Sequence, residues 1–227
     1  MNKRLEAIMA HIPQNGRGVI DVGTDHGYLP AALFQRGYSG RLIAADINAE
    51  PLSKAKRTAE SIGAEDVISL RLCDGLDGCD SSEVDTIVIA GMGGDTICGI
   101  LDRAEWCMAR EYTLILQPMT KCEILRYWLV YNEFEIISEE LVRDDRLYQI
   151  ITARFGGRQR LNDAELFTGS AALIGGDPLF PELRGRLERR FASAVDGMRE
   201  STETEIIDRR RLYEEILNQL RDMEGGR

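Results

Sequence analysis

The stretch VIDVGTDHGYLP, residues 19–30, decides the fold, because it runs from an apolar strand through a glycine turn toward a helix. A strand, a glycine turn and a helix in this order usually open a nucleotide-binding α/β domain. This turn, however, contains Asp25 and His26, where a phosphate-binding turn presents bare backbone. A carboxylate at that position repels a pyrophosphate, so we expect a cationic ligand.

S-adenosylmethionine is a nucleoside ligand that meets this condition, since it has no phosphate and carries a sulfonium and an ammonium group. A nicotinamide dehydrogenase is the weakest alternative, because the sequence has no Gly-x-Gly-x-x-Gly run. We therefore expect S-adenosylmethionine as the cofactor.

The rest of the first two-thirds alternates apolar segments with segments of helix length. The expected strands are residues 18–23, 41–47, 67–75, 85–94 and 113–118, and the expected helices are 29–37, 50–62, 95–104 and 120–132. This alternation predicts βαβ units and a buried parallel sheet. Residues 134–142 and 147–155 are separated by only RDDR, which favours an antiparallel hairpin. The predicted fold class is α/β, with the sheet closed by this hairpin.

The composition changes after FGGRQR, residues 155–160, and we expect two domains, 1–157 and 158–227. In the second, apolar residues recur every three or four positions, which predicts two amphipathic helices in an antiparallel, coiled-coil-like hairpin. The two series are Leu183, Leu187, Phe191, Ala194 and Met198, followed by Ile206, Tyr213, Leu217 and Leu220. The hairpin either supports the fold or dimerises, or it binds substrate.

The composition is that of an ordinary globular protein, with 44% hydrophobic and 29% charged residues among 227. No segment approaches the roughly 18 apolar residues of a membrane span, and no signal peptide is evident. The five cysteines are odd in number and lack CxxC spacing, so we expect reduced thiols and no metal site. We expect a cytoplasmic protein that has no membrane partner and is monomeric.

The net charge of −10 argues against a protein that mainly binds polyanions. All twelve basic residues of 158–227 are nevertheless arginines, whose planar donors match phosphate oxygens. The candidate RNA-binding segments are RGRLERR (184–190) and RRR (209–211). The alternative is a solvated helix face with ion pairs to Glu188, Glu214 and Glu215.

Carboxylates recur where the expected strands end, the side on which open α/β sheets bind ligands. Asp46 lies 23 residues after Gly23 and suits the ribose hydroxyls, and Asp74 with Gly75 suits the adenine amino group. AGMGG (90–94) ends the fourth strand, and its glycines allow a flat substrate to approach the backbone. Each aspartate also has a structural alternative: Asp46 as a helix cap, Asp74 as a turn residue.

Four motifs together, DVGTDHGYLP (21–30), AADIN (44–48), GMGGDTI (91–97) and LQPM (116–119), give a more specific resemblance. The sequence resembles the bacterial tRNA (adenine-N1)-methyltransferases that act on adenine 22, the TrmK family. The resemblance covers residues 1–157 by motif and implies tRNA as partner. It also implies a Rossmann-like class I methyltransferase fold, with a mostly parallel seven-stranded sheet, and a C-terminal helical coiled-coil domain.

By this resemblance, Asp21, Gly23, Asp46, Asp74 and Gly91 line the S-adenosylmethionine site, although Asp21 alternatively only orients the turn. We extend the expected set to neighbouring positions within the same motifs and strand ends. These additional positions are Thr24, Ile47, Gly75, Met92 and Gln117.

The fourth-strand motif also bears on the acceptor atom. GMGG lacks the Asn/Asp-Pro-Pro-aromatic run common in enzymes that methylate the exocyclic amine of adenine. A ring nitrogen such as N1 needs less help, because its lone pair attacks the methyl group directly in an in-line displacement, and a carboxylate stabilises the resulting cation. We expect Asp25 in that role, His26 orienting Asp25 or bonding the cofactor carboxylate, and Tyr28 either stacking on the base or packing the first helix.

Two further hypotheses remain open from the sequence. One is a methyltransferase acting on a small molecule or a protein, which the acidic surface favours. The other is a non-catalytic module that binds S-adenosylmethionine or RNA.

Overall fold

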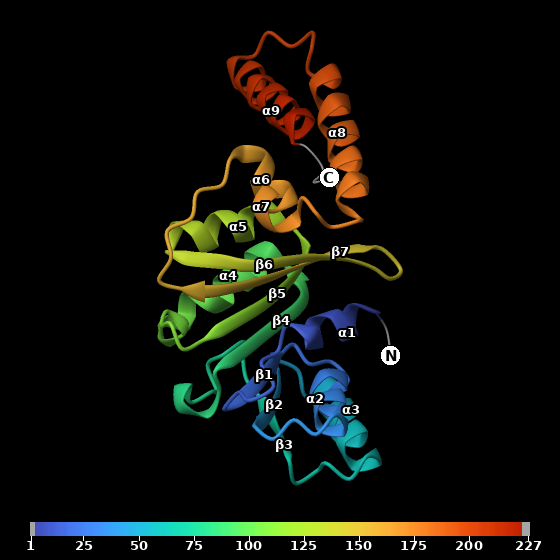
Figure 1. The fold of residues 1–227 in the computed structure, drawn as a ribbon, viewed down its shortest axis with the longest axis vertical. Helices are drawn as coiled ribbons and strands as arrows, with labels where there is room; N and C mark the ends of the chain where they lie inside the picture. The colour runs from blue at the N-terminus through green and yellow to red at the C-terminus, as the bar shows by residue number, and fades with distance from the viewer. Residues whose placement is uncertain (1–2, 224–227) are drawn as a thin grey trace.

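The computed structural model describes residues 3–223, which contain a seven-stranded sheet in the order β3-β2-β1-β4-β5-β7-β6 (Figure 1). The first five strands in the chain are parallel, whereas β7 pairs antiparallel with both β5 and β6. The predicted parallel sheet with a closing hairpin is therefore confirmed. The strands are β1 (Gly18–Val22), β2 (Arg41–Asp46), β3 (Ile68–Leu72), β4 (Thr86–Gly93), β5 (Thr113–Thr120), β6 (Phe134–Arg143) and β7 (Leu147–Phe155).

Helices cover both faces of the sheet, because successive side chains of a strand point to opposite sides. Val19 of β1 packs in one core with α1 (Lys3–Ala10), α2 (Tyr28–Gln35) and α3 (Ala49–Ser61). Ile20, the next residue, packs in the other core with α4 (Gly94–Arg103) and α5 (Cys122–Tyr131). The short 3-10 helices η1 (Ser81–Glu83) and η2 (Glu105–Cys107) lie in the connections. Of these helices, α1, η1 and η2 were not predicted from the sequence.

The chain after β7 is helical, with α6 (Asp163–Thr168), α7 (Ala171–Ile174), α8 (Phe180–Gly197) and α9 (Thr204–Asp222). The predicted hairpin corresponds to α8 and α9, which project beyond the sheet in Figure 1. Their apolar stripes meet in a third core, which holds the buried Leu183, Leu187, Phe191, Leu217 and Leu220.

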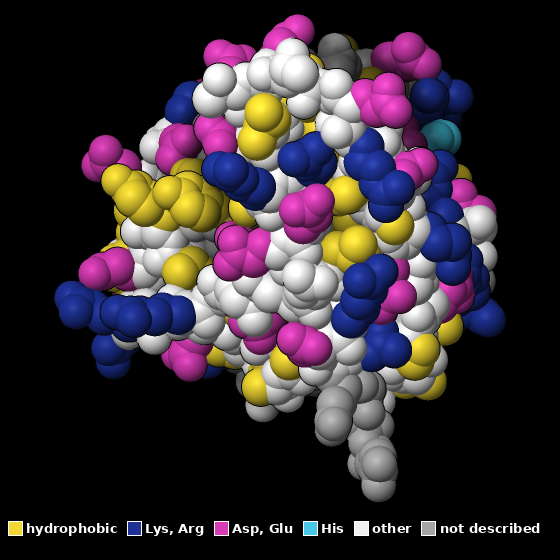
Figure 2. Space-filling model, turned by 90° about the horizontal axis from the view of Figure 1, so that it is seen from above, with side chains coloured by type: hydrophobic (Ala, Val, Ile, Leu, Met, Phe, Trp, Pro, Cys, Tyr) yellow, Lys and Arg dark blue, Asp and Glu magenta, His cyan; other side chains and the backbone are white. Residues whose placement is uncertain are grey.

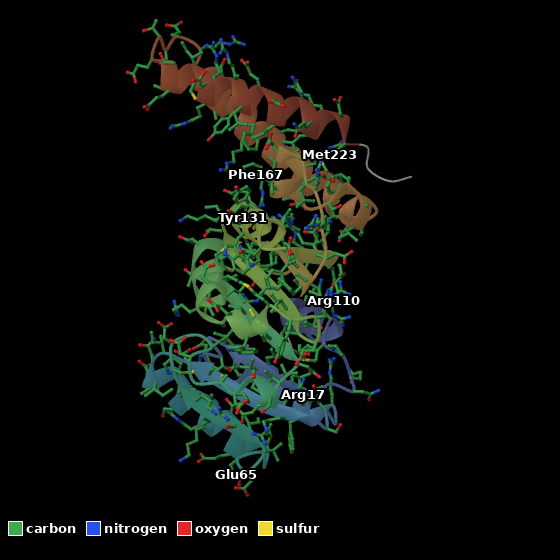
Figure 3. All side chains as sticks on the ribbon, turned by 90° about the vertical axis from the view of Figure 1, so that its left-hand side faces the viewer. Arg17, Glu65, Arg110, Tyr131, Phe167 and Met223 are labelled. Carbon is green, nitrogen blue, oxygen red and sulfur yellow. The ribbon has the colours of Figure 1, made fainter. Side chains whose placement is uncertain are left out.

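The helical part, α6 to α9, packs against the sheet and is not joined to it by a linker alone. The third core also includes Leu141 of β6 and Leu147 of β7. In Figure 3, Phe167 of α6 lies between Met223, in the helical part, and Tyr131 of α5 along the long axis. A division into domains 1–157 and 158–227 stays a proposal, because residues on both sides of residue 157 share one core.

Three general features of residues 3–223 bear on function. None of their helices is both long and apolar enough to cross a membrane. They also contain no group of three or more His, Cys, Asp or Glu side chains arranged to hold a metal ion. All five cysteines are free thiols.

Candidate functional site

A hollow of about 510 Å³ lies at the carboxyl ends of β1 to β4, and we call it the first hollow. It contains the three strand-end positions Gly23, Asp46 and Asp74. The structure brings seven of the ten predicted cofactor-binding residues to its wall. These residues are Gly23, Asp46, Ile47, Asp74, Gly75, Gly91 and Met92.

The turn after β1 has a shape that favours glycine at its first position. Gly23 has a φ of +74°, and its N–H and that of Thr24 donate to the carbonyl of Ala45, at 2.8 and 3.0 Å. A Cβ added to Gly23 would lie 2.2 Å from the Cε methyl of Met92. The glycine therefore lets the Met92 side chain close over the turn, which gives the first hollow an apolar side.

The fourth strand approaches the same place through a bulge. Gly91 has a φ of +80°, and the pairing of β4 with β5 shifts between Ala90 and Met92. The bulge brings Gly91 and Met92 of the GMGG segment into the wall of the first hollow. Gly91 contributes only backbone there, which leaves room for a flat substrate, whereas Met92 contributes its side chain.

The Asp46 carboxylate lies at the end of β2 and is 9% exposed. One of its oxygens accepts a 2.9 Å hydrogen bond from the backbone N–H of Asn48. Asn48, and not Asp46, occupies the N-cap position of α3. Asp46 thus orders the start of the loop while lining the first hollow, where it suits a pair of ribose hydroxyls.

The Asp74 carboxylate is held by an arginine that was not foreseen from the sequence. Arg103 of α4 contacts Asp74 with an N–O distance of 2.9 Å and Asp77 at 3.7 Å. Arg103 itself lines the first hollow. The ion pair fixes the direction of a carboxylate that is 53% exposed and suited to the adenine amino group.

A second hollow of about 130 Å³ adjoins the first and shares Gly23 and Ala90 with it. All three candidate catalytic residues, Asp25, His26 and Tyr28, line this second hollow. The remaining lining residues are Arg4, Leu5, Ile8, Asp21, Thr24 and Leu29. The structure therefore distributes nine of the ten predicted cofactor-binding residues and the three candidate catalytic residues over two contiguous hollows, and it adds Arg4, which was not predicted.

Asp21 is buried beside the turn and is the most perturbed carboxyl group of the site. The Thr24 hydroxyl donates to it at 2.7 Å. Burial raises the pKa of Asp21 from 3.8 to about 6, and the nearby Asp46 carboxylate acts in the same direction, whereas the Thr24 hydrogen bond and Arg4 oppose it. A cationic ligand is the natural partner for a carboxylate that burial has deprived of water. Asp21 both orients the turn and faces the second hollow.

The three candidate catalytic residues form one group on the wall of the second hollow, in which Asp25 and Tyr28 are exposed and His26 is half-buried. Asp25 has a φ of +50°, and its carboxylate lies 3.5 Å from Nε2 of His26. The rings of His26 and Tyr28 stack with centroids 5.1 Å apart and planes 4° apart. Tyr28 is the first residue of α2 and is 58% exposed, so its ring is open to a substrate.

Gln117 differs from the other predicted residues, because it lines neither hollow. It is fully buried in β5, where its amide oxygen accepts a 3.2 Å hydrogen bond from Nη1 of Arg4. Its amide nitrogen donates to the carbonyl of Pro118 at 2.9 Å. The contact with Arg4 is in the structure, while a contact with cofactor stays a prediction.

The residues present fit S-adenosylmethionine. Carboxylates near the ends of β1, β2 and β3 line the two hollows, and those of Asp46 and Asp74 suit the ribose and adenine parts of the ligand. Asp25 in the turn disfavours a pyrophosphate at the same place.

Comparison with known proteins supports this fit. The family model described as "Methyltransferase domain" matches residues 1–151. The tRNA (adenine(22)-N(1))-methyltransferase of Bacillus subtilis is 35% identical over 164 residues, which cover 72% of this chain and 68% of that protein.

Solved structures extend the likeness to nearly the whole chain. The crystal structure of the B. subtilis m1A22 tRNA methyltransferase TrmK has a TM-score of 0.83 at 27% identity and covers 96% of this chain and 98% of that one. A Streptococcus pneumoniae protein solved in complex with S-adenosyl-L-methionine has a TM-score of 0.81 at 28% identity, with 96% and 99% covered.

Proposed function

The chain belongs to the tRNA (adenine(22)-N1)-methyltransferase family, and from this premise we propose that it transfers a methyl group from S-adenosylmethionine to N1 of an adenine in tRNA, at position 22. When bound, the cofactor supplies an electrophilic methyl group on a sulfonium. The observation that carries the proposal is the pair of contiguous hollows, which are lined by the carboxylates of Asp21, Asp46 and Asp74 and by Asp25, His26 and Tyr28.

The chain's own residues divide the work between binding and charge stabilisation. Asp46 and Asp74 bind the nucleoside part, while Gly91 leaves backbone against which the methyl group and a flat base meet. Asp25 stabilises the positive charge that the adenine ring gains when N1 is alkylated. Tyr28 offers an exposed ring for stacking on that base, and His26 holds it by stacking from the other side.

The target adenine must leave any base pair before its N1 is accessible, because N1 lies on the Watson–Crick edge. The basic part of the helical hairpin suits the tRNA backbone. Figure 2, which views the molecule from the α8 and α9 end, shows basic side chains in clusters with acidic side chains among them. Arg184 and Arg210 form ion pairs with Glu188 and Glu214 of their own helices, as the solvated-face alternative expected.

Other arginines of α8 are better placed for phosphate. Arg186 and Arg189 are exposed, and Arg186 lies close enough to Cys122 to favour its thiolate, although burial raises the pKa of that thiol overall. Cys122 begins α5, next to the carboxyl end of β5. Arg186 and Arg189 are therefore the candidates on α8 for contact with tRNA phosphates.

The role of the exposed arginines of α8 in tRNA binding is tested by charge reversal. Truncation after residue 157 is less suitable, because it would expose Leu141 and Leu147. The double variant Arg186→Glu/Arg189→Glu is expected to weaken tRNA binding at least tenfold and to flatten its salt dependence. The matched control is Lys56→Glu/Arg57→Glu on α3, which makes the same charge change on exposed residues far from the hairpin. Equal losses in both variants would remove α8 from the proposal.

The activity itself is tested by incubating an unmodified tRNA transcript with the protein and S-adenosylmethionine and mapping the methylated nucleotide by mass spectrometry. We expect 1-methyladenosine at position 22 and none in a transcript with guanine at that position. Absence of methyl transfer to any tRNA would instead favour a small-molecule or protein substrate, or a non-catalytic module. The proposal also includes a cytoplasmic location and a monomeric state. Light scattering tests the monomeric state.

A further inference from the structure

A third hollow, of about 350 Å³, adjoins the second one. It lies among α1, α2 and α3, which pack next to one another on one face of the sheet (Figure 1). Leu5 and Tyr28 line both the second and the third hollow, so the candidate catalytic tyrosine contributes to two walls. The lining residues of the third hollow are Leu5 of α1, Tyr28, Ala31, Ala32 and Gln35 of α2, and Thr58 and Ile62 of α3.

The residue spacing along α2 explains the form of the third hollow. Tyr28, Ala31, Ala32 and Gln35 are three or four positions apart in turn, so they share one face of the helix. Seven residues of helix rise about 10 Å, which places Tyr28 and Gln35 two turns apart. The two alanines between them have no side-chain atom beyond Cβ. The floor of the hollow is therefore apolar and free of protruding side chains.

The third hollow also differs from the second in charge. Asp21 and Asp25 line the second hollow, whereas no Lys, Arg, Asp or Glu of the described chain lines the third. The Thr58 hydroxyl donates to the carbonyl of Lys54 at 3.2 Å. The exposed Gln35 amide has no hydrogen-bond partner among residues 3–223. A charged group such as a phosphate finds no counter-ion on this wall, while a flat, uncharged group finds an apolar floor and an available amide.

An unpaired nucleobase has these properties. Bases that leave an RNA helix are bound through apolar or aromatic contact with their faces and hydrogen bonds to their edges. A glutamine amide offers a donor and an acceptor side by side, which match two neighbouring atoms of a base edge. The nucleotides next to the target adenine follow it toward the second hollow, because a single phosphodiester joins each of them to it.

We infer that the third hollow binds the base of a nucleotide adjacent to the target adenine, with Gln35 hydrogen-bonded to the edge of that base. The inference rests on the proposed function. It adds a specificity-determining residue, Gln35, that lies outside the motifs that indicated the family, and it makes Tyr28 the wall between two base-binding spaces.

The test removes each side of this contact in turn. Gln35→Leu keeps the size of the side chain and removes its amide. Chemically assembled tRNAs with an abasic residue at position 21 or 23 lack the base on one or the other side of the target. Single-turnover methylation at varied protein concentration gives the apparent tRNA affinity and the maximal rate separately.

With the unaltered tRNA, Gln35→Leu is expected to weaken the apparent affinity about 5- to 10-fold, the range of a lost hydrogen bond. The maximal rate is expected to stay within twofold of wild type, because Gln35 does not touch the reacting atoms. With the abasic residue at one of the two positions, the variant and the wild type are expected to have equal affinities. That position identifies the bound base.

Gln14→Leu is the matched control, the same replacement at an exposed glutamine before β1. Gln14 lines none of the three hollows, and the start of β1 lies at the sheet edge opposite the carboxyl ends. Its replacement is expected to leave the affinity for every tRNA unchanged. Calorimetry with S-adenosylhomocysteine is expected to give the wild-type affinity for both variants.

Three results would overturn the inference. The first is an unchanged affinity of Gln35→Leu for the unaltered tRNA. The second is an equal loss with the unaltered and both abasic tRNAs, which would make the effect independent of the flanking bases. The third is weaker S-adenosylhomocysteine binding, which would assign Gln35 to the cofactor site. All three leave the proposed methyl transfer intact, whereas a wild-type protein that methylates no tRNA would contradict the proposed function as well.

Discussion

The guanidinium of Arg126 and the carboxylate of Glu139 form an ion pair of 2.7 Å in which both side chains are 1% exposed. Arg126 also donates to the amide oxygen of Gln149 at 2.7 Å and to the carbonyl of Leu166 at 2.9 Å. The second oxygen of Glu139 accepts from the N–H of Ser170 at 2.7 Å. One fully satisfied network thus joins α5, the β6–β7 hairpin and the start of the helical part.

Breaking this pair is expected to destabilise the whole chain. Arg126→Ala leaves a buried carboxylate without its partner, a loss of about 3–5 kcal/mol. The control is Arg143→Ala, since Arg143 pairs with Glu182 across the same junction but is 41% exposed; its loss is expected to be below about 1 kcal/mol. Urea unfolding measures both, and comparable losses would contradict a special role for the buried pair.

The pKa of Asp21 predicts a conflict between stability and binding. Folding raises the pKa of Asp21 from 3.8 to about 6. The contribution of the protonated Asp21 to the free energy of unfolding is therefore fully present below pH 3.8 and is lost as the pH rises through 6. Asp21→Asn is therefore expected to stabilise the ligand-free protein by about 2–3 kcal/mol at pH 8, with the difference shrinking below pH 5.

The same variant is expected to bind S-adenosylhomocysteine more weakly, because it removes a negative charge from the wall of the second hollow, which suits a ligand with a cationic group. Unfolding at pH 4 and pH 8, with calorimetry at pH 8, measures the two effects. A variant that is less stable than wild type at pH 8 would show that the Asp21 charge is fully compensated in the fold.

Gly23 and Gly37 allow a matched test of the β1 turn, because their φ values of +74° and +78° impose the same backbone strain on alanine. A Cβ at Gly23 meets the Met92 methyl, whereas a Cβ at Gly37 has nothing within 4 Å. Both alanine variants are expected to lose about 1 kcal/mol of stability. Only Gly23→Ala is expected to lose cofactor affinity, by tenfold or more in calorimetry, and equal affinities would argue against the tight contact.

Asp25→Asn is expected to lower turnover about 10- to 100-fold, because it removes the negative charge that stabilises the developing cation. Asp25 is exposed at the mouth of the second hollow, so the affinity for S-adenosylhomocysteine is expected to stay within about twofold of wild type. Single-turnover methylation and calorimetry together separate the two quantities. If both fall equally, Asp25 is a cofactor-binding residue.

The sequence predicted those features that repeat locally along the chain. Apolar strands, amphipathic helices and the aspartates after strands each leave a pattern within a few residues, and seven of the ten predicted cofactor positions line the first hollow. The short helices α1, α6 and α7 were not predicted, because they are short and do not lie between two of the expected strands. The equally short α2 was predicted, because it follows the glycine turn between two expected strands.

Contacts between distant residues could not be read in this way. Arg4 and Gln117 are 113 positions apart, and only the packing of α1 over the sheet brings them together. Gln117 was recognised through the LQPM motif, but its partner was not, since an arginine in an N-terminal helix has many possible surroundings. Arg103 was missed for the same reason: its pairing with Asp74 depends on how α4 packs against the loop after β3.

The most direct measurement of the central claim is calorimetric titration of the protein with S-adenosylmethionine and, separately, with NAD and ATP. The acidic hollows at the ends of β1 to β3 predict saturable binding of S-adenosylmethionine at one site per chain, with no heat from the two phosphate-containing ligands. Binding of NAD or ATP at that site, with S-adenosylmethionine giving no signal, would contradict the account.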